Sequence, residues 1–185
     1  MKGVKQLAGF IIVVFAMAGC QQMTTQPVGT TVLGKKQVKS AHAMNMSKSM
    51  NFRTHLAGRN EVPAVDTRAQ GQAIFQFDAS GDTIAYKLIA ANVDSVFMAH
   101  IHLGAADENG PVVVWLYPPD GPPPSLIPGR FDGVLAEGTI TANDFTGPLA
   151  GESMDILLEK IRHDSAYVNL HTSQNPAGEI RGQIF

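Results

Sequence analysis

The stretch QAIFQFDASGDTIAYKLIA, residues 72–90, contains two alternating runs separated by a Ser-Gly-Asp turn. In the first run Ala73, Phe75 and Phe77 fall on one side of an extended chain, because successive strand side chains point to opposite faces. The second run repeats this apolar alternation over residues 84–88. The stretch therefore predicts two antiparallel strands, each with one face buried in a core.

The same combination of short alternating runs and turn residues continues to the end of the chain. A proline-rich run at 118–124 predicts a loop, because proline removes donors from a sheet ladder. Strands at this spacing are typical of a mainly all-β antiparallel sandwich or barrel of Greek-key type. Besides the two runs above, strands are expected at 52–56, 96–103, 112–117, 131–141, 166–171 and 179–185.

One segment has helical rather than alternating periodicity. Met154, Leu157, Leu158 and Ile161 fall at i, i+3, i+4 and i+7, which places them on one face of a helix. Ser153 directly precedes this run and is a suitable N-cap. The fold prediction therefore includes one short peripheral helix.

The N-terminus has the features of an export signal. Lys2 and Lys5 precede an uncharged apolar stretch at 7–19, and small residues stand directly before Cys20. Thirteen residues are short for a bilayer core, which takes about 20 helical residues. The Met-Ala-Gly-Cys ending resembles the lipobox of bacterial lipoproteins, which implies lipidation of Cys20 and membrane anchoring. A buried cysteine in an apolar N-terminal helix is the alternative.

These features divide the chain into three parts. We expect a lipoprotein signal peptide at 1–19, a lipidated cysteine with a flexible tether at 20–50, and one domain at 51–185. By resemblance to enterobacterial lipoproteins, Gln21 suggests the outer membrane, on its periplasmic or surface face. The tether also contains methionines near His42, which could bind Cu(I), although a linker without a metal is the simpler interpretation.

The charge of the chain argues against nucleic-acid binding, and its cysteine content excludes an intramolecular disulfide. The chain has 14 basic and 16 acidic residues, and removal of 1–19 would leave 12 basic ones. A mildly acidic chain without a basic run is poorly suited to phosphate backbones, so we expect no nucleic-acid partner. Because Cys20 is the single cysteine, no intramolecular disulfide can form.

Polar residues occur at alternate positions inside three of the expected strands. His100 and His102 share one strand face, and a neighbouring ion could be reached by both imidazoles. His171 is the candidate third ligand on a later strand, and imidazole suits copper and zinc. The alternative is a set of hydrogen-bonded structural histidines. The other members of the polar cluster are Glu61, Asn169, Glu179 and Arg181.

The roles of these other members stay open. Glu179 and Arg181 share a strand face, and a structural ion pair or a turn-locking contact is the simplest interpretation. Glu61 could pair with Arg181 or reach the histidines. No serine nucleophile elbow or phosphate-binding glycine loop is present in the sequence, so there is no positive sign of an enzyme.

Five motifs closely resemble the chordin-type (CHRD) domain, in that family's order. The resemblance covers residues 51–185 and implies an immunoglobulin-like β-barrel, but it implies little biochemistry. The motifs are LAGRNEVP (56–63), HIHLG (100–104), NGPVV (109–113), YVNLHT (167–172) and NPAGEIRGQI (175–184).

A second resemblance is to copper/zinc superoxide dismutase, through the His-x-His strand at 100–102. That enzyme's disulfide cannot form here, and no segment resembles its zinc loop. Three hypotheses follow. The first is an anchored binding or structural module with a Cu or Zn site, the second is a dismutase-like redox enzyme, and the third is a metal-free protein–protein interaction module.

Overall fold

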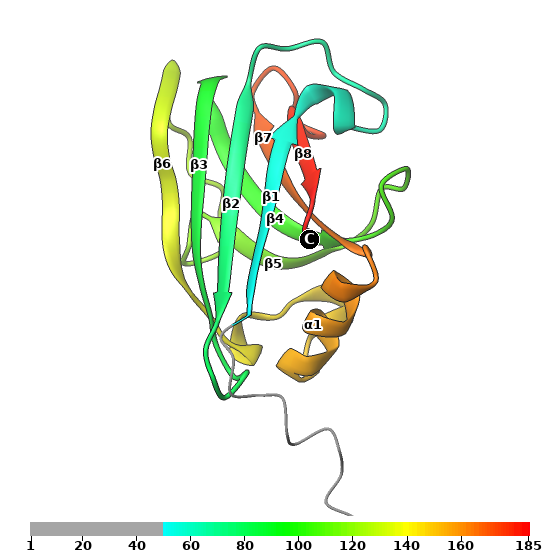
Figure 1. Cartoon of the computed structure of the whole chain (residues 1–185). Coiled ribbons are helices and arrows are strands. Elements are labelled where there is room, and N and C mark those ends of the chain that lie inside the picture. Colours follow the sequence, from blue (N-terminus) through cyan, green and yellow to red (C-terminus); the bar gives the residue numbers. More distant parts are fainter. Residues whose placement is uncertain (1–49) are drawn as a thin grey trace, which may run out of the picture. The chain divides into compact units, whose positions relative to one another are not determined.

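The computed structural model describes residues 50–185, and the signal, lipidation and tether predictions lie outside them. The described part contains eight antiparallel strands in a single sheet (Figure 1), with the order β5-β4-β7-β8-β1-β2-β3-β6. The strands are β1 (Asn51–Ala57), β2 (Gln70–Phe77), β3 (Ile84–Asp94), β4 (Val96–Leu103), β5 (Val112–Tyr117), β6 (Arg130–Ile140), β7 (Ala166–Thr172) and β8 (Ile180–Gln183). The prediction of a mainly antiparallel β fold with one short helix is confirmed.

The sheet curls into a nearly closed barrel rather than two separate sheets. Its edge strands are β5 and β6, and the segment that follows β6 binds the free edge of β5. Val114 forms a bridge with Phe145, and the Thr146 amide donates to the Val113 carbonyl oxygen at 2.9 Å. Closure matters because an uncovered strand edge presents unpaired backbone groups.

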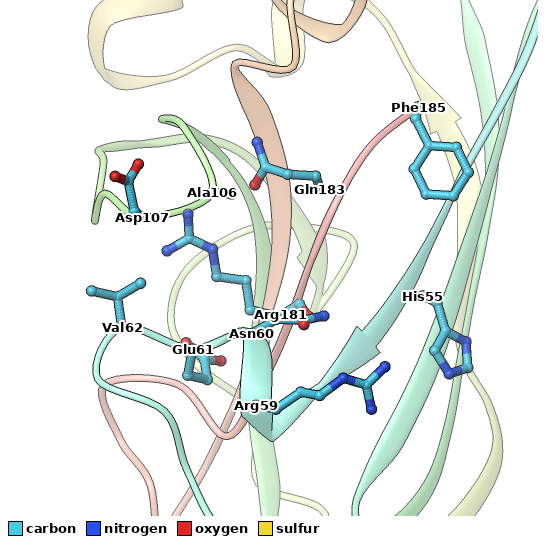
Figure 2. Close-up of a pocket in the computed structure, with 10 residues that line it drawn as sticks. All are labelled: His55, Arg59, Asn60, Glu61, Val62, Ala106, Asp107, Arg181, Gln183 and Phe185. Atoms are coloured by element: carbon cyan, nitrogen blue, oxygen red, sulfur yellow. The ribbon is translucent and has the colours of Figure 1, made fainter.

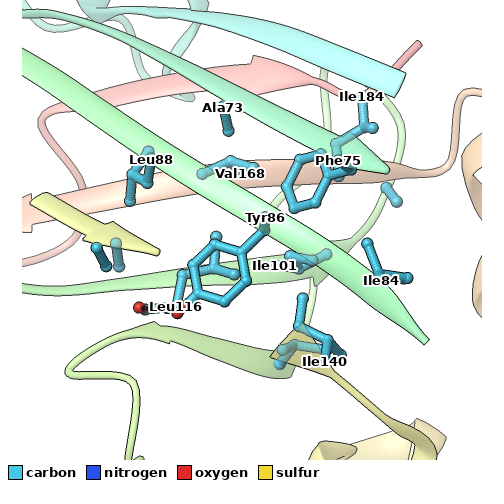
Figure 3. Packing of buried hydrophobic residues seen from close by; sticks show 14 of the residues in the cluster. Ala73, Phe75, Ile84, Tyr86, Leu88, Ile101, Leu116, Ile140, Val168 and Ile184 are labelled. Carbon is cyan, nitrogen blue, oxygen red and sulfur yellow. Dashed lines mark hydrogen bonds between the residues drawn. The ribbon is translucent and has the colours of Figure 1, made fainter. Parts of the chain in front are cut away.

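The two runs that open the sequence form the wall of the barrel. β2 and β3 pair in register from Gln70–Ala91 to Phe77–Ile84, and the alternation is visible in the burial of β2. Figure 3 shows Phe75, Leu88 and Ile140 pointing into the interior with residues from the other strands. Burial of these side chains, each worth about 1.5–3 kcal/mol, stabilises the fold.

One polar group crosses this core. The Tyr86 hydroxyl donates to the Leu116 carbonyl oxygen at 2.8 Å, on the far side of the interior. Burial raises the pKa of Tyr86 to about 12, so the phenol stays protonated. Gly138 leaves room for its ring, because a Cβ there would lie 3.1 Å from Tyr86 Cε1.

The one α-helix among residues 50–185, α1 (Met154–Arg162), lies at one end of the barrel and leads into β7 (Figure 1). Its predicted apolar face is confirmed, because all four residues are buried. Ser153 is the N-cap residue, as predicted, although its side chain makes no capping hydrogen bond. Packing of the apolar face, rather than a side-chain cap, fixes the start of this helix.

Short 3-10 turns complete the described chain: η2 (Gly58–Asn60), η3 (Ala142–Asp144) and η4 (Gly147–Leu149). The first begins a connection from β1 to β2 that runs outside the barrel, beside β7 and β8 (Figure 1). A second connection, residues 104–111, joins β4 to β5. Arg181 of β8 contacts both connections, because its main-chain oxygen accepts from Asn60 Nδ2 and its side chain donates to the Ala105 oxygen. None of the helices in residues 50–185 is long and apolar enough to span a membrane.

Candidate metal site

The site is built on the outward face of three neighbouring strands, β4, β7 and β8. Ala99 and Ile101 of β4 face the core, so the intervening histidines face outward as the alternation predicts. An outward face is normally exposed, yet His100 is only 2% exposed and His171 5%. Trp115 of β5 lies against His100, while the Gly110 oxygen contacts His102 and the Pro176 oxygen contacts His171, so β5 and two loops help to bury the rings.

The pairing of β4 with β7 brings the histidines together. His100 lies opposite Asn169, His102 opposite Tyr167, and His171 opposite Met98. One ring nitrogen from each of the three histidines lies within 4.8 Å of the others. The sequence hypothesis required these rings to converge, and the structure brings them together.

The pairing of β4 with β5 is irregular beside the histidines, and in both places the extra residue, Leu116 or Val113, lies on β5. The register of β4 against β5 shifts between Ala99 and His100 and again between Ile101 and His102. Bulges of this kind re-aim the side chains beside them and are frequent at functional sites. Here each shift lies immediately before a histidine of the cluster.

Backbone carbonyls orient two of the three rings. His102 Nδ1 lies 2.9 Å from the Gly110 oxygen, and His171 Nδ1 lies 3.1 Å from the Pro176 oxygen. A carbonyl only accepts, so each Nδ1 carries the proton and each Nε2 has a free lone pair. A hydrogen bond to the outer ring nitrogen is the usual support of a metal-binding histidine.

The third ring, that of His100, contacts His171 directly. His100 Nδ1 lies 3.2 Å from His171 Nε2, and without an ion the former donates to the latter. This leaves His100 Nε2 unprotonated, and it has no hydrogen-bond partner within the described chain; the same holds for His102 Nε2. Two buried lone pairs without donors are costly, since an unsatisfied buried polar atom costs about 1–3 kcal/mol.

The cluster is electrically neutral at physiological pH. Burial, together with the smaller effect of the neighbouring His171 and His102, lowers the pKa of His100 to about 3. Burial lowers the pKa of His171 to about 4 against its hydrogen bond to Pro176, and it also lowers the pKa of His102. Neutral imidazole is the form that binds metal ions, so this environment keeps the ligands ready.

Glu61 and Asn169 form a buried pair beside the histidines. Asn169 Nδ2 donates to both carboxylate oxygens of Glu61, at 3.0 Å each, and the two residues are 4% and 7% exposed. Burial raises the pKa of Glu61 to about 7, although the charge of Arg181 and the bond from Asn169 lower it. Glu61 thus reaches the cluster through Asn169; it is not within salt-bridge distance of Arg181 in the described structure.

Arg181 has a structural role different from the predicted ion pair. Among residues 50–185 no salt bridge joins it to Glu179; its guanidinium donates to the carbonyl oxygens of Ala105 and Glu108, at 2.6 and 2.8 Å. It also contacts Asn109 Oδ1 at 3.2 Å. The turn-locking interpretation describes this geometry, and the ion-pair interpretation is wrong. Glu179 instead accepts from the Thr67 hydroxyl at 2.7 Å.

A stack links Arg181 to the histidines. The guanidinium carbon lies 3.5 Å from the centre of the Tyr167 ring, and the same ring is stacked on His102 with centroids 4.9 Å apart and an interplanar angle of 12°. The Tyr167 hydroxyl accepts a hydrogen bond from the Gly110 amide, and the Gly110 carbonyl oxygen accepts one from His102 Nδ1. Arg181, Tyr167 and Gly110 therefore fix the position of the His102 ring.

A cavity of about 510 Å³ opens beside Arg181 (Figure 2). Its lining includes Arg59, Glu61, Arg181 and Gln183, but none of the three histidines. The cavity therefore adjoins the polar cluster without reaching the imidazoles directly.

Several contributors to the site were not identified from the sequence. Trp115 of β5 lies edge-on to His100, with ring centroids 4.3 Å apart. The carbonyls of Gly110 and Pro176 belong to loops, and any residue type has a carbonyl. Only the aromatic character of Trp115 was a sequence signal, and it is equally typical of packing in a barrel wall.

Comparison with known families assigns the chain. The family model of the CHRD domain matches residues 52–184, and this chain therefore belongs to the CHRD-domain family. No curated protein and no solved structure matches the chain.

Proposed function

We propose that this protein is an exported, lipid-anchored module whose CHRD barrel holds one copper or zinc ion on His100, His102 and His171. The observation that carries the proposal is the convergence of three nearly buried, neutral imidazoles whose ligand atoms lie within 4.8 Å. Imidazole is a preferred ligand of both metals.

The spacing of the rings fits an ion. Two nitrogens bound at about 2.0–2.1 Å with a tetrahedral angle lie about 3.3 Å apart. His100 Nδ1 and His171 Nε2 are 3.2 Å apart, so an ion can replace the proton they share. His102 Nε2, held by the Gly110 contact, supplies the third bond. An ion would also satisfy a buried lone pair that has no donor.

Anchoring is supported by the sequence alone. The apolar stretch at 7–19, followed directly by Cys20, suits export and lipidation. Two or more acyl chains give stable membrane attachment where one does not.

Elemental analysis tests the metal site. The purified chain is stripped with a chelator, reloaded with Cu(II) or Zn(II) and freed of excess ion, and we expect one ion per chain. His100→Ala and His171→Ala should lose it, while the exposed His55→Ala serves as the matched control. Equal metal content in the chain without substitutions and in all three variants would show that these histidines do not hold the ion, and would contradict the proposed site.

Fluorescence gives an independent measurement at the same place. Trp115 is the only tryptophan and lies against His100, so bound Cu(II) should quench its emission while Zn(II) should not. Superoxide turnover by the copper-loaded chain would favour the dismutase-like enzyme. Absence of any stoichiometric metal would favour the metal-free interaction module.

A further inference from the structure

Asn169 occupies the centre of the polar face. It lies in β7 between Tyr167 and His171, opposite His100 on one neighbouring strand and Arg181 on the other. Directly opposed residues on one sheet face have Cβ atoms about 4.5–5.5 Å apart. The Asn169 side chain therefore lies on the same face as the imidazoles, beside His100.

The direction of this amide is fixed. Asn169 Nδ2 faces both oxygens of Glu61 and donates to each, which is the arrangement that an ionised carboxylate requires. Reversing the amide would set its oxygen against those oxygens. The carbonyl oxygen, Oδ1, is consequently held away from Glu61.

The main chain closes over this pair. A Cβ on Gly178 would lie 2.5 Å from Asn169 Nδ2, 2.8 Å from its Oδ1 and 2.9 Å from Glu61 Oε1. The φ angle of Gly178 is +137°, which also favours glycine. Gly178 thus packs directly on the amide and leaves no space for a side chain there.

Asn169 Oδ1 is buried and has no hydrogen-bond partner in residues 50–185. His102 Nε2, which the proposed site assigns to the ion, is also a buried acceptor without a donor. Two unsatisfied lone-pair atoms on one face are matched by a cation better than by another acceptor.

From this arrangement we infer that Asn169 Oδ1 fills the fourth coordination position of the ion, with Glu61 as the positioning residue that directs the amide. The inference rests on the proposed metal site. It makes the site a closed one, with three nitrogen ligands and one amide oxygen. Closed sites hold structural or stored ions, whereas catalytic sites keep a position for water or substrate. An amide oxygen is also known as a weak axial ligand of copper.

Azide binding to the Cu(II)-loaded full chain tests this assignment. Azide is a small anion that binds an open copper position and produces a new charge-transfer absorption. We expect no new band in the unmodified protein. Asn169→Ala should bind azide and should lose about tenfold in copper affinity, as is usual when support of a site is removed. The exposed Asn143→Ala is the matched control and should behave like the unmodified chain.

Glu61→Gln provides a second variant that keeps the shape of the side chain. A glutamine can donate to Asn169, so the amide can reverse and withdraw its oxygen from the ion. We expect a changed Cu(II) electron paramagnetic resonance spectrum, together with some azide binding, while circular dichroism stays native. A purely structural role for Glu61 would leave that spectrum unchanged and would contradict the positioning role.

The outcomes separate this inference from the proposed function. If no stoichiometric copper binds, the metal site itself fails. If copper binds and the unmodified chain takes azide as readily as Asn169→Ala, the fourth position is open and the inference is wrong. Copper bound without azide binding in either protein would also overturn the assignment of Asn169. Should Asn169→Ala unfold, the Glu61→Gln spectrum still decides.

Discussion

The imidazole of His102 is largely buried, yet its Nε2, a ligand atom of the proposed site, has no hydrogen-bond partner in the described part of the chain. A residue selected only for packing would be expected to be apolar at such a position, because burial of an unsatisfied polar atom is unfavourable. The cost is understandable where the lone pair has a ligand to bind. A buried polar atom without a hydrogen-bond partner distinguishes this site from an ordinary barrel wall, which is made of apolar residues.

Acid should destabilise the metal-free protein through these histidines. An unfolded histidine binds a proton near pH 6.5, whereas burial lowers the pKa of His171 to about 4 and of His100 to about 3 in the folded chain. Below pH 6.5 the unfolded state therefore binds more protons, and the free energy of unfolding falls as the pH falls.

The loss should continue down to about pH 3–4, where the folded histidines also become protonated. Glu61, whose raised pKa favours the protonated folded form, opposes part of this loss between its ordinary pKa and about 7. Urea unfolding at several pH values measures the dependence. His100→Gln should show a smaller slope below pH 6.5, and an unchanged slope would show that His100 is not responsible.

At the scale of elements, the connection at 104–111 depends on β8. Its residues Ala105, Glu108 and Asn109 all accept hydrogen bonds from Arg181, which is 1% exposed and stacked on Tyr167. One guanidinium therefore holds the loop that carries the Gly110 carbonyl, and through it orients His102.

Arg181→Lys should release this loop. Lysine keeps the charge but loses the planar fork and the stacking surface, and hydrogen bonds to charged groups are worth about 1.5–3 kcal/mol each. We expect a loss of about 2 kcal/mol in stability and faster amide hydrogen exchange at 104–110. Arg68→Lys, at an exposed position, is the control and should change neither quantity.

The helix α1 contributes to the fold through its apolar face. Leu157 is fully buried in the core cluster, so Leu157→Ala removes contacts and leaves a cavity. We expect a loss of about 2–5 kcal/mol in the free energy of unfolding. Glu159→Ala, on the exposed face, should stay within about 0.5 kcal/mol. Equal effects of the two substitutions in urea unfolding would show that α1 does not pack as described.

At the scale of the whole molecule, the proposal joins a barrel to a membrane anchor. The anchor prediction concerns Cys20, which lies outside the described residues. The chain without substitutions is expressed in a bacterium that modifies lipoproteins. It should enter the detergent phase on partitioning, because the acyl chains on Cys20 are apolar. Cys20→Ala should remain in the aqueous phase; if it still followed the detergent, lipidation of that residue would not be the cause of membrane association.

The sequence by itself determined the fold class and the composition of the polar face. Strand alternation has a period of two, so it fixes locally that His100 and His102 share a side, as do Tyr167, Asn169 and His171. The turns and the helical spacing at 154–161 are equally local, which is why the barrel and its one helix could be predicted.

Only the tertiary structure decided how these faces meet. The β4–β7 register sets Asn169 opposite His100, and the loops bring the carbonyls of Gly110 and Pro176 to the rings. Arg181 was expected beside Glu179, but it binds a loop more than 70 residues away along the chain instead. Such partners depend on non-local pairing, and a carbonyl is common to all residues, so no pattern in the sequence can indicate which one will be used.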